Sequence, residues 1–390
     1  MQVFFASICF SQQANSETAF RNYRNDADTV INHRALGSFF DKLKKIENSD
    51  TLLTVNILHI GDSHIQADFL TREIRNSLQS RFGNAGRGLV FPYRLTKSNE
   101  SYDYRSHSVS SWKWENIRRR KRDFEPGIAG TSMLSTDDIF KFELKMNKRD
   151  SVDNTFRKVR LICRNDSNGL LAFVTDATSM NRKLVAFTGD TLYETKLEKS
   201  TDNIEIQSTT NILLDGIILT NEKKGILYHV VGINGAHYAD FNQSQVFFSE
   251  MPLLQPDVVF VSLGTNEGVN SRVSSQSVTD EATKMVQNIR SQGLQAPILL
   301  ITPFASYYRR KKPNPYLKVV QKGLIQAAEQ TNSACLDMFE ISGGTAAASE
   351  WRQLGLFAND RIHFTVKGYA LQGKMIYNTL INCYTKYVGH

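Results

Sequence analysis

The sequence of 390 residues is poor in cysteine and has no long apolar run, and both scarcities exclude classes of protein. Neither a disulfide framework nor a cysteine metal knot is indicated, because the cysteines lie far apart without paired spacing. They are Cys9, Cys163, Cys335 and Cys383. No apolar stretch approaches the ~20 residues of a membrane span. We therefore expect no integral membrane span and no metal site.

Signatures of nucleic-acid recognition are also missing. The sequence has no zinc-finger spacing, no helix-turn-helix pattern and no RNA-binding aromatic motif. The formal charge of +8 and the pI of about 9.2 nevertheless suit an acidic partner such as an anionic glycan or a membrane surface. We expect no nucleic-acid partner.

What the chain does contain is typical of a globular protein, with 41% hydrophobic and 22% charged residues and a length sufficient for two domains. Residues 1–13 resemble the end of an apolar signal core, although a basic start is missing. We interpret 1–17 as a truncated export signal, with a short buried segment as the alternative. Export predicts a periplasmic or secreted protein.

Short alternating runs separated by polar turns fill residues 96–228, which predicts an inserted all-β domain of the β-sandwich kind. The strand candidates are 140–146, 159–163, 170–174, 212–214 and 217–219. Trp112 and Trp114 are compatible with a sugar-stacking platform or with the packing face of one strand. The basic run 118–122 is compatible with an anionic ligand or with a solvated loop.

Strand and helix alternate in the remaining segments, 18–95 and 229–390. Their apolar runs lack the alternation of a half-exposed strand, which predicts a parallel sheet covered by helices on both faces. One run ends at Gly61 in a sharp turn that carries Ser63, and an amphipathic helix follows. Three further polar turns follow in this part of the chain, and open α/β sheets keep their sites at the carboxyl ends of strands.

These four turns, in this order, resemble the conserved blocks of the SGNH (GDSL-type) hydrolases. They are Gly61-Asp62-Ser63-His64, Gly232-Ile233-Asn234-Gly235-Ala236, Gly264-Thr265-Asn266-Glu267 and Asp360-Arg361-Ile362-His363. The resemblance implies a flavodoxin-like, three-layer α/β/α hydrolase domain interrupted by the β domain. It also implies esterase activity without a cofactor. By the same resemblance, the backbone N–H groups of Ser63 and Gly235 and the side-chain amide of Asn266 form the oxyanion hole.

Elementary chemistry assigns roles to three of these residues. A serine hydroxyl needs a base within hydrogen-bond reach, because it does not ionise near neutral pH. His363 is the candidate base, and Asp360 stands three residues earlier, where it can orient the imidazole and stabilise its charged form. We therefore predict Ser63, His363 and Asp360 as the catalytic residues. A helix-capping turn is the alternative for Asp360 and His363.

Two departures from the family pattern refine the expected substrate. His64 stands where the name-giving lipases have leucine, and the third block reads Thr-Asn-Glu where many members have Asn-Asp. The first two blocks are similar to those of peptidoglycan O-acetylesterases, some of which carry an inserted β-sandwich of carbohydrate-binding type. We expect His64 and His237, with Trp112 and Trp114, to contact substrate.

The predicted function is that of an exported serine esterase that removes O-acetyl groups from a polysaccharide, with peptidoglycan as the expected polymer, through an acetyl-serine intermediate. An esterase or lipase acting on another acylated glycan or a short-chain ester is the first alternative. A glycan-binding protein with a vestigial site is the second.

Overall fold

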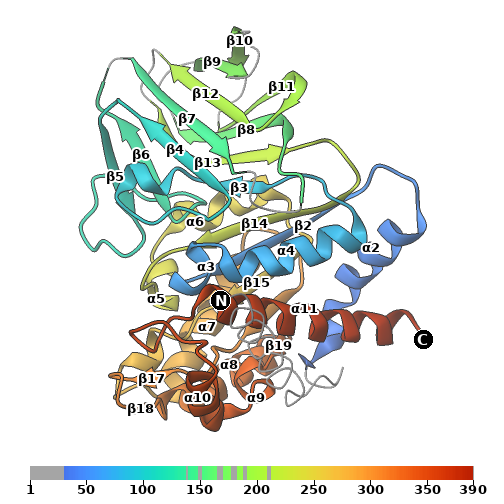
Figure 1. Cartoon of the computed structure of the whole chain (residues 1–390), viewed down its shortest axis with the longest axis vertical. Coiled ribbons are helices and arrows are strands. Elements are labelled where there is room, and N and C mark those ends of the chain that lie inside the picture. Colours follow the sequence, from blue (N-terminus) through green and yellow to red (C-terminus); the bar gives the residue numbers. More distant parts are fainter. Residues whose placement is uncertain are drawn as a thin grey trace, which may run out of the picture.

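The computed structural model describes residues 30–137, 139–147, 152–164, 170–176, 182–187, 191–208 and 212–389. The predicted signal segment, 1–17, lies outside these residues, as does Cys9. The α/β part occupies the lower half of Figure 1, and a part made of antiparallel strands occupies the upper half.

A six-stranded sheet is the centre of the α/β part, with the order β1-β19-β16-β15-β2-β14. All neighbouring strands from β19 to β14 are parallel, and only β1 runs antiparallel at the edge, which confirms the predicted parallel sheet. The strands are β1 (Val30–Ile31), β2 (Thr54–Gly61), β14 (Gly225–Gly232), β15 (Val258–Ser262), β16 (Ile298–Ile301) and β19 (Ala334–Leu336).

Helices cover both faces of this sheet, because alternate residues of each strand pack into two different cores. Val55 and Ile57 face a core shared with α2, α4 and α11, whereas Leu58 and Ile60 face a core shared with α7 and α8. The principal helices are α2 (Gly37–Asn48), α4 (Phe69–Phe82), α7 (Ser275–Arg290), α8 (Tyr316–Gln330) and α11 (Val366–Val388). Shorter helices are α3 (Ser63–Gln66), α5 (Tyr238–Phe241), α6 (Gln245–Ser249), α9 (Met338–Ile341) and α10 (Gly344–Gln353).

Two antiparallel sheets, hereafter the β insert, interrupt the α/β part between β2 and β14. One has the order β10-β9-β12-β7-β4 and the other β11-β8-β13-β6-β5, with β3 added beside β13. The strands are β3 (Gly88–Val90), β4 (Tyr104–Ser108), β5 (Trp112–Asn116), β6 (Thr131–Ser135), β7 (Phe140–Met146), β8 (Phe156–Arg164), β9 (Leu170–Asp176), β10 (Arg182–Phe187), β11 (Leu192–Thr201), β12 (Asn203–Ser208) and β13 (Leu213–Thr220). Inward side chains of both sheets share one apolar core, as in a sandwich.

The predicted boundaries of the inserted segment, 96 and 228, differ from those of the sheets. β3 begins at Gly88 and already pairs with β13, whereas β14 begins at Gly225 and belongs to the α/β sheet. A strand of three residues gives too little alternation to be recognised in the sequence. The two candidate strands 212–214 and 217–219 form one strand, β13, whose pairing with β8 shifts between Leu214 and Gly216.

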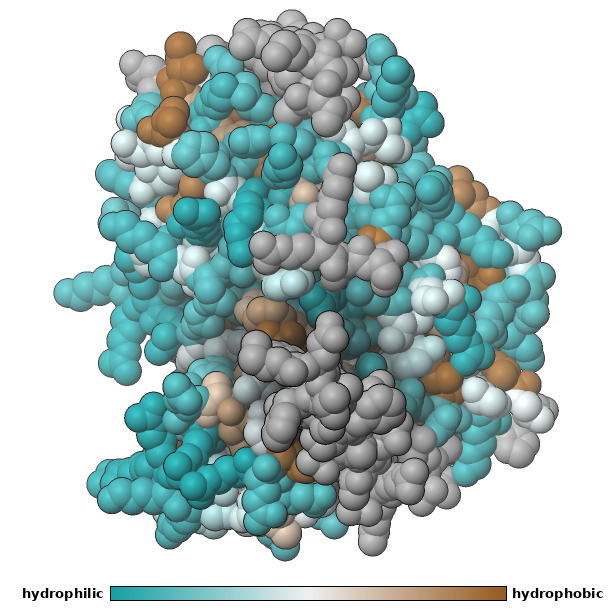
Figure 2. All heavy atoms as spheres, viewed as in Figure 1, coloured by the Kyte–Doolittle hydropathy of each residue, from teal (hydrophilic) through white to brown (hydrophobic). Residues whose placement is uncertain are grey.

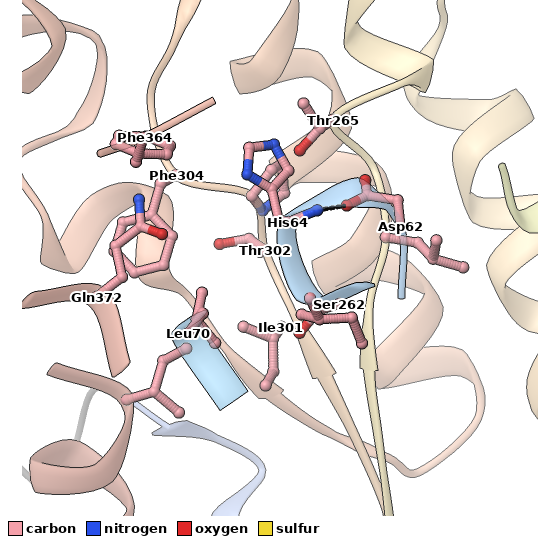
Figure 3. A pocket seen from close by; sticks show the side chains of 14 residues that line it. Asp62, His64, Leu70, Ser262, Thr265, Ile301, Thr302, Phe304, Phe364 and Gln372 are labelled. Carbon is pink, nitrogen blue, oxygen red and sulfur yellow. Dashed lines mark hydrogen bonds between the residues drawn. The ribbon is translucent and has the colours of Figure 1, made fainter. Parts of the chain in front are cut away.

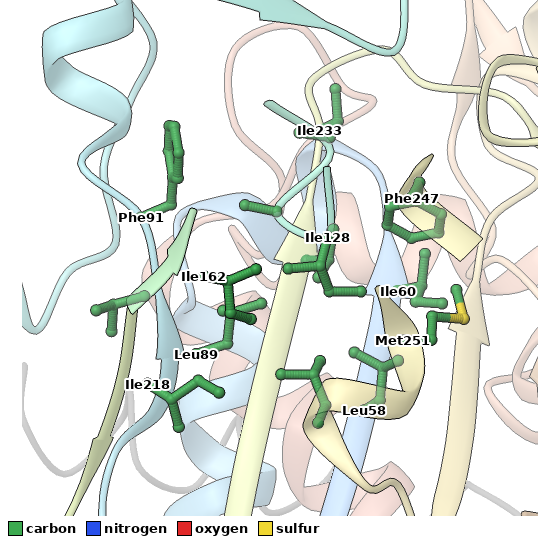
Figure 4. Close-up of a cluster of buried hydrophobic side chains, with 14 of the residues drawn as sticks. Leu58, Ile60, Leu89, Phe91, Ile128, Ile162, Ile218, Ile233, Phe247 and Met251 are labelled. Atoms are coloured by element: carbon green, nitrogen blue, oxygen red, sulfur yellow. The ribbon is translucent and has the colours of Figure 1, made fainter. Parts of the chain in front are cut away.

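The β insert is not a separate body with its own core. Leu58 and Ile60 of β2 pack in the same cluster as Leu89, Ile162 and other residues of the insert (Figure 4). A single dry core across the junction opposes relative motion of the two parts. The insert therefore has a fixed position along the edge strand β14, and Ile233, just beyond the end of that strand, packs in the same core.

The visible surface is mainly hydrophilic, and apolar side chains appear on it only in small groups (Figure 2). Among the helices of the described ranges, none combines the length and the hydrophobicity needed to cross a bilayer.

Candidate active site

Ser63 stands at the first position of the one-turn helix α3, directly after β2. The preceding Asp62 caps the turn, since its side chain accepts a hydrogen bond from His64 N at 2.9 Å. At Gly61 a Cβ atom would lie 2.7 Å from the carbonyl oxygen of Ser262, so the sharp exit from the strand requires glycine. The local sequence thus exposes one serine at the sheet edge.

A chain of two hydrogen bonds joins Ser63 to residues that lie 300 positions away in the sequence. Ser63 Oγ is 2.8 Å from His363 Nε2, and His363 Nδ1 is 2.7 Å from Asp360 Oδ2. These distances fit a neutral imidazole that donates from Nδ1 to the carboxylate and accepts the serine proton at Nε2. The turn before α11 therefore brings the predicted base and its partner to the predicted nucleophile.

Asp360 is held in its ionised form by the turn in which it stands. Partial burial raises its pKa, but hydrogen bonds from the His363 ring and from the backbone N–H groups of His363 and Ile362 lower it below the ordinary value. Its side chain is 40% exposed and that of His363 is 37% exposed. A solvent-facing carboxylate–imidazole pair is open to substrate from one side.

The loop 232–236, hereafter the oxyanion loop, lies against the Ser63 turn. Ile233 N donates to Gly61 O at 3.1 Å, and Asn234 N donates to the side-chain oxygen of Gln66 at 2.6 Å. Gly235 has a φ of +72°, a left-handed conformation that favours glycine. Within the described part of the chain, the N–H groups of Ser63 and Gly235 have no hydrogen-bond partner, so both are available as donors.

The side-chain amide of Asn266 lies in the same place. Its Nδ2 donates to Ala236 O at 2.9 Å and makes a longer contact of 3.3 Å with Asp62 Oδ2. The first bond anchors the amide beside Gly235. The second N–H is held only by the long contact and can turn to a stronger acceptor.

The comparisons with known proteins agree with this geometry. Residues 218–371 match the model of the GDSL-like Lipase/Acylhydrolase family, a range that contains Gly235, Asn266, Asp360 and His363 but not Ser63. Over this range the chain resembles the GDSL-type acylhydrolases. The family match and the fold together identify a carboxylic ester hydrolase, and the predicted fold class is confirmed.

Several solved structures resemble the hydrolase. A peptidoglycan O-acetylesterase matches with a TM-score of 0.77 and 21% identity over 92% of this chain and 99% of its own length. A lipase/acylhydrolase from Enterococcus faecalis matches 40% of this chain and 75% of its own, with 20% identity and a TM-score of 0.31. A family two carbohydrate esterase from Cellvibrio japonicus matches 73% of this chain and 99% of its own length, with 9% identity and a TM-score of 0.31. No curated protein matches the sequence.

His64, the first of the predicted substrate contacts, is half-buried beside Ser63. Its ring lines a pocket that Phe364 and Gln372 also line (Figure 3). Nδ1 bonds to the hydroxyl of Tyr369 at 3.1 Å, and Nε2 is inaccessible to solvent and unpartnered in the described structure. Burial, followed by the charge of His363, lowers the pKa of His64 to about 3, so the ring is neutral. It supports the ring of His363, whose centre is 5.1 Å away.

The two tryptophans are packing residues rather than an open platform. Trp112 meets Phe140 and Phe142 edge-on, and its Nε1 donates to Ser108 Oγ at 3.0 Å. Trp114 lies under the guanidinium of Arg119, 4.0 Å from the ring centre. Of the two interpretations, the packing face of one strand, β5, therefore agrees with the structure.

His237 lies closer to the predicted site, on a groove beside the oxyanion loop. It caps α5, and its Nδ1 is 3.2 Å from Asp240 Oδ2. That hydrogen bond raises the pKa of His237 above its ordinary value because it favours the imidazolium, although burial opposes the shift. His237 is 42% exposed and remains a candidate for contact with substrate.

Two residues near the site, Gln66 and Arg118, lie outside the four sequence blocks. The sequence therefore assigned neither of them an individual role in the site. Gln66 holds the oxyanion loop, since its side chain accepts from Asn234 N and donates to Asn99 O at 2.9 Å. Arg118, one member of the basic run, reaches the same loop from the β insert and donates to Asn234 O at 3.0 Å. A run of basic residues indicates an anionic partner. Only the fold shows which residues of the run 118–122 lie beside the site.

Buried carboxyl groups surround the anchored amide of Asn266. Burial raises the pKa of Asp62 to about 7, although the hydrogen bond from His64 N opposes the shift. Burial also raises the pKa of Glu267, which accepts a hydrogen bond from Tyr238 N at 2.9 Å and so ties the third block to α5. The contact of Asn266 Nδ2 with Asp62 Oδ2 is long, at 3.3 Å, so the second N–H of Asn266 can serve an oxyanion.

Proposed function

We propose that this hydrolase removes O-acetyl groups from peptidoglycan, with Ser63 as nucleophile, His363 as general base and acid, and Asp360 as the orienting carboxylate. The observation that carries the proposal is the hydrogen-bonded chain from Ser63 Oγ through His363 to Asp360, at a turn bordered by two unused backbone donors. This arrangement suits acyl transfer to a serine and its hydrolysis.

The reaction then runs in two halves. His363 Nε2 takes the proton of Ser63 as Oγ attacks the acetyl carbonyl, and the same proton passes to the sugar oxygen as the ester bond breaks. Water, activated by His363, next attacks acetyl-Ser63 and releases acetate. The N–H groups of Ser63 and Gly235 and the amide of Asn266 stabilise the negative oxygen in both halves.

The choice of peptidoglycan rests on three observations. The chain shares its fold, with the β insert, with a peptidoglycan O-acetylesterase over nearly its whole length. Its net charge of +8 favours an anionic polymer. The Ser63 edge of the sheet also lies beside the β insert, which is fixed there by a shared core and is positioned to hold a polymer. An acetylated polymer of this kind implies a periplasmic or secreted enzyme.

The test is acetate release from purified O-acetylated peptidoglycan, beside an acetylated xylan and a small aryl acetate, with Ser63→Ala as control. We expect release from peptidoglycan that the substitution abolishes. Ser63-dependent cleavage of the xylan alone would favour the second candidate, an esterase for another acylated glycan. Cleavage of the aryl acetate alone would retain the mechanism and reject both polymers, and loss of all three activities would favour a glycan-binding protein.

A further inference from the structure

A groove runs beside the oxyanion loop and has walls from both parts of the molecule. Three residues of the basic run line it from the β insert, Arg118, Arg119 and Arg120, and His237 and Glu267 are among those that line it from the α/β part. The oxyanion loop lies between Ser63 and this groove. A substrate whose ester reaches Ser63 would therefore place its neighbouring groups along the groove.

Arg118 is the residue of the insert that comes closest to the expected oxyanion donor. Its guanidinium lies where a side chain at Gly235 would stand, with Nη1 2.9 Å and Cζ 3.0 Å from the position of an ideal Cβ. One N–H donates to Asn234 O, which fixes the group against the loop. The absence of a side chain at Gly235 thus leaves room for a cation as well as for substrate.

Two other arginines of the run already have partners. Arg119 contacts Glu115 at 3.2 Å and covers the ring of Trp114, and Arg122 contacts Glu125 at 2.9 Å. Arg118 has no carboxylate partner among the described residues, and its remaining donors have no hydrogen-bond acceptor there. A planar guanidinium with free donors is suited to bind a carboxylate through two bonds.

The acidic side chains of the groove already have donors of their own. Asp240 accepts from His237, Glu267 accepts from Tyr238 N, and Glu281 accepts from the amide of Asn242 at 2.8 Å. They therefore leave the guanidinium of Arg118 available to an incoming anion.

We propose that Arg118 is a specificity-determining residue that binds a carboxylate of the glycan next to the acetylated sugar. The inference rests on the proposed function and names the group that the enzyme recognises beside the ester. Peptidoglycan offers such carboxylates on its peptides, and on those lactyl ethers that carry no peptide. The β insert thus completes the substrate site of the α/β part with one fixed cation.

The experiment compares one polymer in two forms. Soluble O-acetylated peptidoglycan fragments are used untreated or with their carboxyl groups converted to methylamides, at matched acetyl content. The quantity measured is the ratio of kcat/KM for the two forms. Any effect of a substitution on the oxyanion loop acts on both forms alike and cancels in this ratio.

The wild-type ratio should favour the free carboxylates by about tenfold or more, as for a hydrogen bond between charged groups. Arg118→Ala should reduce the ratio to about one, and Arg118→Lys should give an intermediate value because it keeps the charge without the planar fork. Lys121→Ala removes the same charge from the same run, at a residue that does not line the groove, and should keep the wild-type ratio. Circular dichroism and a thermal melt establish that each variant is folded.

A wild-type ratio of one, or an unchanged ratio in Arg118→Ala, would overturn the inference and leave the proposed function intact. A loss of ratio in Lys121→Ala equal to that in Arg118→Ala would also overturn it, in favour of general attraction by net charge. Acetate release from neither form, with Ser63-dependent cleavage of an aryl acetate, would reject peptidoglycan as substrate and this inference with it.

Discussion

The side-chain amide of Asn266 illustrates what a single residue contributes to the site. Its Nδ2 holds the Ala236 carbonyl and leaves a second N–H for the developing oxyanion. Asn266→Ala should lower kcat by about 10²–10³, the usual cost of one oxyanion donor. The free energy of unfolding should fall by only about 1 kcal/mol, the net value of one hydrogen bond. Steady-state kinetics with an aryl acetate and urea denaturation measure the two effects.

Asn288 supplies the matched control for this prediction, because its amide donates to Asn242 in the α/β part and not toward Ser63. Asn288→Ala should leave kcat within a factor of about two while costing similar stability, again about 1 kcal/mol. If Asn266→Ala retained full turnover, the oxyanion would have to be stabilised by backbone donors alone.

The two adjacent imidazoles of the site should respond differently to substitution. His363→Gln removes the group that accepts the Ser63 proton, so we expect kcat to fall by about 10²–10⁴. His64→Gln removes a buried neutral ring that contacts Tyr369 and packs against His363. His64→Gln should affect only the orientation of the His363 ring. We expect it to lower kcat by less than about tenfold, which corresponds to about 1.4 kcal/mol. Equal losses in both variants would place His64 in the proton transfer itself.

At the scale of elements, a buried ionic cluster ties α4 to the entrance of the β insert. Arg75 and Arg87 contact Asp68 and Asp103, and all four side chains are at most 2% exposed. Arg87→Met would leave Asp103 buried with less compensation, and removal of one partner from such a pair costs about 3–5 kcal/mol. Chemical denaturation should show this loss of stability.

Arg81 of the same helix α4 provides the control, because its ion pair with Glu47 is partly exposed, at 33% and 28%. Arg81→Met should change the free energy of unfolding by about 0–1 kcal/mol, since solvent screens such pairs. Equal effects of the two substitutions would mean that the cluster does not stabilise the junction.

Most helices and strands could be predicted from the sequence, but the course of one strand, β13, could not. The α/β elements and most strands of the β insert were predictable because their apolar residues recur with the periods of helix and strand. β13 was divided in two because Asp215 interrupts its apolar run. In the fold Asp215 is fully buried and binds Arg164 at 2.6 Å, so a charge that resembles a turn in the sequence lies inside a strand. Periodicity does not reveal the partner of a buried charge.

At the scale of the whole molecule, the candidate site also combines residues that local sequence patterns predict with a contact that only the fold reveals. The four blocks predicted Ser63, His363 and Asp360 together because each stands in a turn of a known kind, although 300 residues separate the first two. Arg118 approaches Gly235 only because the β insert packs on the α/β sheet through a common core. A contact of this type depends on the angle between two layers, which no local pattern encodes.

The stability of the junction between the β insert and the α/β part should depend on pH. His229 of β14 is fully buried, and its Nδ1 accepts a hydrogen bond from Leu89 N of β3 at 3.1 Å. Burial, together with the charges of Arg160 and Arg87, lowers the pKa of His229 from 6.5 to about 3. The folded protein keeps this ring neutral at pH values where the unfolded chain protonates it. The stability that His229 contributes is therefore present above about pH 6.5 and is lost as the pH falls toward 3.

His229→Asn removes this titration while keeping an acceptor for Leu89 N. The difference in free energy of unfolding between wild type and variant, measured by urea denaturation, should decrease by about 1.4 kcal/mol per pH unit between pH 6 and 4. Taking the difference cancels the opposite contribution of buried carboxyl groups such as Asp62, whose raised pKa favours the folded state in acid. A difference that stayed constant with pH would mean that acid reaches His229 without unfolding, and that the junction opens while the rest of the molecule remains folded.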